Sequence, residues 1–178
     1  MVRVSAAALR TIEELEAAWA AGPDTPGGGA VELICVRRLG GVHETPERVE
    51  VTVEGGVDGD RWALGERPNL EAQVTLMNIR VVDLITHDGV ALDASGDNFL
   101  VDLDLSEAAL PVGTRLRIGT AVLEVSDEPH TGCKKFRERF GLDALTWVND
   151  HRDRRLRGMN CRVLEAGAVA VGDSVVVV

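Results

Sequence analysis

One cysteine of the chain lies in a setting that favours reactive sulfur. Cys133 stands at the expected start of a helix whose first residues are basic, beginning with Lys134. A thiol at a helix N-terminus beside positive charge has its anionic form stabilised, so its pKa falls and its reactivity rises. We therefore expect Cys133 to bind a soft metal or to carry sulfur. The alternative is a core cysteine, because Cys133, Phe136 and Phe140 would share one helix face.

His130 lies three residues before this cysteine and is a candidate catalytic residue. It could donate or accept a proton, or stabilise the thiolate as a cation. A histidine that only shapes the loop is the alternative reading. A zinc site would take His130, Cys133, His151 and Cys161 as ligands, although their spacing matches no compact zinc motif. Cys161 and Cys35 lie in alternating apolar stretches, so we expect both to be buried in strands.

Composition narrows the classes of partner. The chain has 178 residues, a hydrophobic fraction of 45% and a formal net charge of −10. It contains no run of eighteen apolar residues, so we expect a cytoplasmic protein without a membrane partner. The acidic charge argues against nucleic acid, which rewards a positive surface. Residues 134–157 nevertheless hold eight of the nineteen lysines and arginines. This local cationic region suits a small anionic ligand.

The chain divides into two parts by composition. Residues 9–21 carry apolar side chains at helical spacing, and Thr11 with Glu14 resembles a capping box. A stretch rich in glycine and proline follows. We therefore assign residues 1–29 to an N-terminal helical appendage with its linker, and residues 30–178 to the main domain.

The sequence pattern predicts a mainly β structure for the main domain. Short apolar runs separated by glycine, proline and aspartate predict strands at 31–38, 48–54, 73–77, 98–103, 114–118, 120–126, 161–165 and 174–178. Helices are expected near 79–87, 105–109, 133–140 and 142–149. We expect hairpin turns at Gly119-Thr120 and at Gly172-Asp173. Many short strands need their edges protected, which favours a closed or partly closed, mostly antiparallel β-barrel.

Several separated motifs, taken in order, resemble one family. They are Gly59-Asp60-Arg61-Trp62, Gln73 to Arg80, Gly96-Asp97-Asn98-Phe99, Gly113 to Gly119, the Cys133 segment, Arg162 to Gly167, and Val171-Gly172-Asp173-Ser174-Val175. Together they resemble the MOSC domain, named for the C-terminal part of molybdenum cofactor sulfurases. The resemblance extends from about residue 30 to 178 and suggests a small standalone member of bacterial type. In this chain three residues separate Pro129 from Cys133, where many relatives have proline and cysteine adjacent.

The resemblance implies a barrel-like fold that binds the pyranopterin molybdenum cofactor or carries sulfur. The family's cysteine, which can ligate molybdenum or hold a persulfide, corresponds to Cys133. The chain has no room for a pyridoxal-phosphate desulfurase domain, so persulfide sulfur would come from a separate cysteine desulfurase.

A pyranopterin phosphate and dithiolene need several converging donors, for which arginine and asparagine are suited. The candidates fall within or beside the family-like motifs: Arg61, Asn78, Arg80, Asn98, Lys134, Arg157, Asn160 and Arg162. A solvated charge or a turn-stabilising amide is the alternative for each of them. For Asp60 we expect a structural role.

Three functions follow from these expectations. The first is a molybdenum-cofactor-dependent oxidoreductase that acts on N-hydroxylated or related small substrates, with electrons from an external donor. The second is a persulfide carrier or sulfurtransferase that uses Cys133. The third is a non-catalytic barrel that binds an anion or a partner protein, and a homodimer is left open.

Overall fold

The structure is a computed structural model that describes residues 9–23 and 29–178. A closed barrel of seven strands forms its centre, with strands adjacent in the order β1, β12, β8, β9, β10, β6 and β7. The strands are β1 (Gly29–Ile34), β6 (Val74–Asn78), β7 (Phe99–Val101), β8 (Arg115–Ile118), β9 (Ala121–Val125), β10 (Met159–Glu165) and β12 (Ser174–Val177). The predicted mainly β, barrel-like fold is confirmed.

Strand burial follows the position of each strand in the barrel. In β8, Arg115 and Arg117 are exposed while Leu116 and Ile118 are buried, as expected for a strand with one solvent-exposed face. Every residue of β6 is buried because helices cover its outer face. The predicted turn at Gly119-Thr120 joins β8 to β9, which pair as a hairpin.

One pair of barrel strands is parallel. Strand β6 pairs with β7 in parallel, whereas the other pairs in the barrel are antiparallel. A parallel connection needs a crossover, which α2 (Ile79–Ile85) and the 3₁₀ turn η4 (Leu92–Ser95) supply. Asn78 caps α2 by accepting a hydrogen bond from the Arg80 amide at 2.8 Å. This crossover brings residues 95–98 beside the first residues of β6, where Asn98 accepts a hydrogen bond from the Thr75 amide at 3.1 Å.

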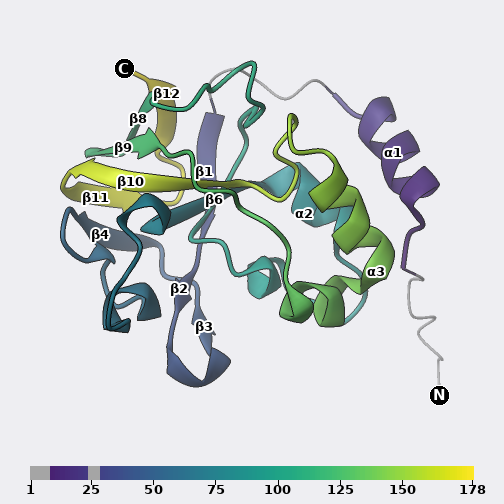
Figure 1. The fold of residues 1–178 in the computed structure, drawn as a ribbon, viewed down its shortest axis with the longest axis horizontal. Helices are drawn as coiled ribbons and strands as arrows, with labels where there is room; N and C mark the ends of the chain where they lie inside the picture. Colours follow the sequence, from purple (N-terminus) through teal and green to yellow (C-terminus); the bar gives the residue numbers. More distant parts are fainter. Residues whose placement is uncertain (1–8, 24–28) are drawn as a thin grey trace.

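Two smaller β units flank the barrel. A three-stranded sheet has the order β11 (Gly167–Ala170), β4 (Arg48–Thr52) and β5 (Gly56–Val57). Strands β2 (Val36–Arg37) and β3 (His43–Glu44) form a projecting hairpin (Figure 1). The 3₁₀ turns η1 (Leu39–Gly41), η2 (Arg61–Leu64) and η3 (Leu70–Ala72) lie in the connections.

Three helices gather on one side of the barrel (Figure 1). They are α1 (Ile12–Ala21), α2 and α3 (Lys134–Asp150), and they share a second apolar cluster that includes Leu15, Val82, Phe140 and Trp147. Helix α3 is interrupted at Gly141, whose φ of 87° lies in the left-handed region that favours glycine. The predicted helices 133–140 and 142–149 correspond to its two parts.

Helix α1 packs on α2 and α3. The predicted capping box of Thr11 and Glu14 is present. Leu15 is fully buried, and Trp19 meets Trp147 edge-on with ring centroids 6.2 Å apart. Glu16 accepts hydrogen bonds from Trp147 Nε1 at 2.9 Å and from Arg154 Nη2 at 2.7 Å, and it also pairs with His151. The helix is therefore anchored to the segment that follows α3. Part of the predicted linker, residues 24–28, lies outside the described residues.

Some local predictions were wrong. Residues 105–109 form turns instead of a helix, because Leu105 and Leu110 are buried against the barrel core. Gly172-Asp173 does not close a hairpin, since β11 pairs with β4 whereas β12 pairs with β1 and β8. The short strands β3, β5 and β11 were not anticipated. Among the described residues, no helix is long and apolar enough to cross a membrane.

The packing of α1 predicts that Leu15→Ala lowers the free energy of unfolding by about 2–5 kcal/mol, because the truncation leaves a cavity in the helical cluster. Chemical denaturation measures this change. Leu9→Ala, at a side chain that is 51% exposed, is the control and should change stability by less than about 0.5 kcal/mol. An equally small effect of Leu15→Ala would show that α1 is not part of the cooperative unit.

Candidate functional site

Cys133 is the N-cap residue of α3 and is exposed to solvent. Partial burial acts to raise its pKa, but the backbone N–H groups of Phe136 and Lys135 and the charge of Arg157 outweigh this effect and lower the pKa below 9.0. The thiol makes no side-chain hydrogen bond of ordinary capping geometry. An accessible sulfur with a lowered pKa is suited to metal ligation or nucleophilic attack. The core-cysteine alternative does not hold.

The segment before Cys133 is fixed by contacts with two neighbouring elements. Asn160 in β10 donates from Nδ2 to the carbonyl oxygens of Glu128 and Pro129, at 3.1 and 3.3 Å. Asn149 in α3 accepts a hydrogen bond from the Gly132 amide at 2.7 Å. A side chain at Gly132 would lie 2.4 Å from Leu145 Cδ1, so glycine permits this close approach. The backbone leading to the thiol is therefore held in one position.

A buried carboxylate links this segment to the barrel. Asp97 is fully buried and accepts two hydrogen bonds from Arg157 Nη1, at 3.0 and 2.8 Å. It also contacts His130 Nε2 at 2.6 Å. Burial acts to raise the pKa of Asp97, but the charges of Arg157 and His130 outweigh it and lower the pKa to about 2. Asp97 is thus ionised at neutral pH and joins both basic side chains.

The contact with Asp97 also sets the state of His130. Burial and the charge of Arg157 lower the pKa of His130, although Asp97 opposes them. At neutral pH the ring is therefore neutral. Because an ionised carboxylate can only accept, His130 Nε2 carries the proton and donates it to Asp97. Nδ1 is then an acceptor, and it has no hydrogen-bond partner among the described residues.

Arg157 is held on several sides but keeps one free donor. Its guanidinium lies over the Phe136 ring, with Cζ 4.8 Å from the centroid, and Nη2 donates to the Ser95 carbonyl at 3.4 Å. The residue is only 7% exposed. Its Nε is the one buried side-chain nitrogen or oxygen without a partner among the residues described. An unpaired buried N–H is costly, and an anionic ligand would satisfy it.

A second buried network supports the residues around Asp97. Arg37 in β2 forms a two-pronged ion pair with Asp60, with both N–O distances at 2.9 Å. The same arginine donates to the Gly96 carbonyl at 3.4 Å. Asn98 donates to Asp60 Oδ2 at 3.0 Å and accepts from the Thr75 amide at 3.1 Å. The residues on both sides of Asp97 are therefore fixed by Arg37, Asp60 and Thr75.

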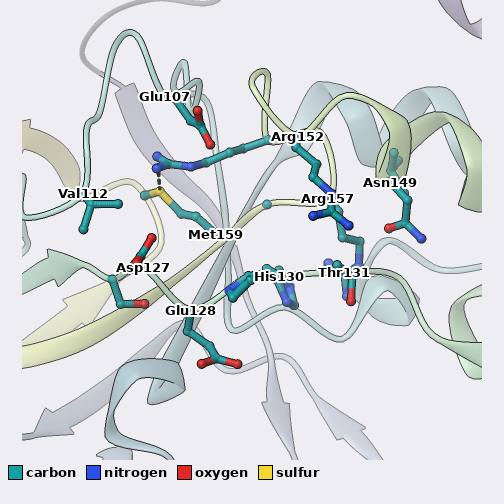
Figure 2. Close-up of a pocket in the computed structure, with 15 residues that line it drawn as sticks. Glu107, Val112, Asp127, Glu128, His130, Thr131, Asn149, Arg152, Arg157 and Met159 are labelled. Carbon is teal, nitrogen blue, oxygen red and sulfur yellow. Dashed lines mark hydrogen bonds between the residues drawn. The ribbon is translucent and has the colours of Figure 1, made fainter.

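A small pocket opens beside His130. Its volume is about 180 Å³, and the segment Ser126–Thr131, the end of α3 and the segment Arg152–Met159 supply most of its wall. We call it the His130 pocket. Figure 2 shows Asp127 and Glu128 on one side and Arg157 and Asn149 on the other. Cys133 does not line this pocket. The thiol and the pocket are thus separate features of one chain segment.

The structure brings three of the predicted site residues together. Cys133, His130 and Arg157 lie around one cluster, and Asn160 holds the segment that carries the first two. Lys134 is next to the thiol in sequence, but its side chain is 88% exposed and, within residues 9–23 and 29–178, pairs only with Glu138, at 3.8 Å. Its binding role stays a prediction.

The other predicted binding residues lie elsewhere. Asn78 caps α2, and its Nδ2 donates to the Leu103 carbonyl at 2.8 Å. Arg80 stacks on Trp19, with Cζ 4.3 Å from the ring centroid. Arg162 pairs with Glu124 at 2.5 Å on the barrel wall. Arg61 lines a shallow pocket with Arg37 and Trp62, and Asn98 is committed to the network described above.

The zinc alternative finds no support in the described residues, which contain no group of three histidine, cysteine or carboxylate side chains placed to hold a metal. Cys161 is buried in β10, as predicted; Cys35 is buried too, but it lies between β1 and β2 and not within a strand. Burial raises the pKa of each thiol to about 12. Of the three cysteines, Cys133 is therefore the one that is exposed and has a lowered pKa.

Two residues of these networks, Asp97 and Arg37, were missed from the sequence. Asp97 belongs to the motif Gly96-Asp97-Asn98-Phe99, and its position directly before the candidate Asn98 was the signal that could have identified it. Asp60 was assigned a structural role, which the structure confirms. Arg37 gave no signal, because its role depends on the position of the β2–β3 hairpin.

Comparisons with known proteins agree on the fold. Residues 69–176, more than half of the chain, match a family model described as the MOSC domain. No curated protein matches the sequence. The fold is similar to the crystal structure of the YuaD protein from Bacillus subtilis, with a TM-score of 0.59 and 19% identity over 83% of this chain and 94% of that one. It is also similar to YiiM from Geobacillus stearothermophilus, with a TM-score of 0.58 and 19% identity over 84% and 75%.

Thiol reactivity tests the assignment of Cys133. We expect iodoacetamide to alkylate this residue with a pH midpoint below 9.0, because the amides of α3 and Arg157 stabilise the thiolate. Cys35 and Cys161, with pKa values of about 12 and no exposure, should react only in denaturant. Peptide mass spectrometry over a pH series measures each site. A midpoint for Cys133 at or above 9.0 would contradict the assignment.

The buried carboxylate predicts an acid-dependent stability. A carboxyl with a lowered folded-state pKa stabilises the fold above its unfolded-state pKa, here 3.8, and this contribution is lost as pH falls toward about 2. Asp97→Asn should cost about 3–5 kcal/mol at neutral pH, since it leaves Arg157 buried without its partner. Denaturation at several pH values measures both effects. Asp58→Asn, at an exposed site, is the control; equal costs for the two variants would refute the assignment.

Proposed function

The chain belongs to the MOSC domain family, and from this premise we propose that it binds the pyranopterin molybdenum cofactor with Cys133 as a ligand to the metal. The observation that carries the proposal is the exposed thiol at the N-terminus of α3, with its pKa lowered by backbone amides and Arg157. A thiolate is a soft ligand suited to molybdenum.

The residues near Cys133 fit the pyranopterin molybdenum cofactor better than they fit a metal ion that is bound by protein side chains alone. A bare metal ion needs several protein ligands, and no such group occurs among the described residues. A metal that arrives chelated by the dithiolene of its own cofactor needs only one added ligand.

Each residue of the cluster has a distinct task in this proposal. The cofactor, when bound, supplies two-electron oxidation or reduction to a small substrate, such as an N-hydroxylated compound, with electrons from an external donor. Cys133 provides the sulfur ligand. His130, neutral and held by Asp97, accepts a proton at Nδ1 or returns it. Arg157 keeps Asp97 ionised and attracts negative charge.

The same thiol favours a second candidate function. An exposed cysteine with a lowered pKa is also a nucleophile that could take sulfane sulfur from a separate desulfurase and pass it to an acceptor. The two functions differ in what remains on the protein, which is molybdenum with pterin in the first case and one added sulfur in the second.

Metal analysis of the wild-type protein and of Cys133→Ser tests the proposal. Protein produced in a host that makes the cofactor should contain molybdenum and fluorescent pterin, and the substitution should lower the molybdenum content at least about tenfold, because the metal loses its thiolate. Lys135→Gln, next to the site and exposed, is the control.

Absence of molybdenum and pterin from wild-type protein with Cys133 intact would refute cofactor binding. Intact-mass measurement after incubation with a desulfurase and cysteine tests the second candidate. One added sulfur that is missing in Cys133→Ser would support it.

A further inference from the structure

The His130 pocket contains charged side chains that have no ion-pair partner. Asp127 and Glu128 are exposed on one side, and Arg152 is exposed at the segment that follows α3. None of the three forms an ion pair with another described residue. The Glu128 carbonyl is held by Asn160, which fixes the backbone between the two carboxylates and His130. The free charges of both signs therefore border one defined cavity.

The other charges of this pocket are already compensated. Burial lowers the pKa of Arg155, and the charge of Glu107 partly offsets this effect. Arg155 Nη1 also donates to the Leu110 carbonyl at 2.6 Å. The charge of Arg157 is balanced by Asp97 at 2.8 Å. The charges left for a ligand are consequently two carboxylates and one guanidinium.

Arg157 adds positive charge on the side opposite the carboxylates. The residue is only 7% exposed, and Figure 2 shows it across the pocket from Glu128. Its unpaired Nε has no exposed surface, so Arg157 attracts a ligand carboxylate by its charge, while the exposed Arg152 donates the charge-assisted hydrogen bond. The pocket thus offers acceptors for a cation at one end and donors for an anion at the other.

Size limits the ligand further. A volume of about 180 Å³ holds roughly six water molecules at the volume of the liquid. This is below the range of about 300–1,000 Å³ that is usual for drug-sized ligands. A whole pyranopterin is therefore too large for the pocket, whereas a molecule of amino-acid size fits.

We propose that the His130 pocket binds a small zwitterion of amino-acid size. Asp127 and Glu128 hold its ammonium group, and Arg152 with Arg157 holds its carboxylate. The binding itself is independent of the cofactor. Only the identification of this zwitterion as the substrate rests on the proposed function, because His130, which transfers the proton in that proposal, lines the same pocket.

Three probes of matched length test the two ends separately. Isotope-labelled protein without molybdenum is titrated with γ-aminobutyrate, with butyrate, which lacks the ammonium group, and with propylammonium, which lacks the carboxylate. Amide shifts of residues 126–131 and 152–159 in the NMR spectrum report binding. We expect γ-aminobutyrate to bind roughly 2- to 5-fold more tightly than either truncated probe, as expected for one exposed ion pair.

Substitutions at exposed positions test which side chains bind the ammonium group and which bind the carboxylate. Asp127→Asn combined with Glu128→Gln should remove the preference over butyrate, and Arg152→Gln should reduce the preference over propylammonium, because Arg157 remains at that end. Glu50→Gln, exposed on β4 and outside the pocket, should change neither.

Equal binding of butyrate in wild-type protein would reveal a simple anion site, and equal binding of propylammonium a simple cation site; either result overturns the proposal, as does the absence of shifts with all three probes. Molybdenum content is measured on separate protein, so a failure of zwitterion binding is distinct from a failure of cofactor binding.

Discussion

The ion pair between Asp97 and Arg157 is the interaction on which the candidate site depends. A fully buried carboxylate is tolerated only where cations and donors compensate it, and here Arg157 and His130 do so. The same pair fixes the neutral form of His130, orients Arg157 over Phe136 and brings positive charge near Cys133. Without Asp97, Arg157 and His130 would have no common partner.

The barrel provides the rigidity that this pair requires. Asp97 lies two residues before β7, whose parallel pairing with β6 is made by the crossover through α2. Arg157 lies two residues before β10, which pairs with β6 on the other side. The two charged residues are thus placed by strands that flank one central strand. Helix α3 then closes the site with Cys133 at its first turn, and its apolar face packs on the neighbouring helices.

The sequence predicted the barrel, its longer strands and the reactive cysteine, because these depend on local pattern. Alternation placed β8 and β9, and the basic helix start marked Cys133. The partners of Asp97 were harder to find, since Arg157 and Asp97 lie sixty residues apart. Arg80 and Arg157 are both arginines beside family-like motifs, but one stacks on Trp19 and the other is buried at the cluster. Only the three-dimensional arrangement distinguishes them.

Closure of the barrel determines when the thiol of Cys133 acquires its lowered pKa. Strand β1 pairs with β12, so Gly29 lies opposite Val175 and the sheet cannot close before the last strand has been synthesised. Contacts of such long sequence separation are made slowly, after much of the chain has left the ribosome. Arg157 lies twenty-four residues after Cys133 and acts on the thiol only in the folded protein. The lowered pKa of this cysteine is therefore a property of the complete fold and not of the local sequence alone.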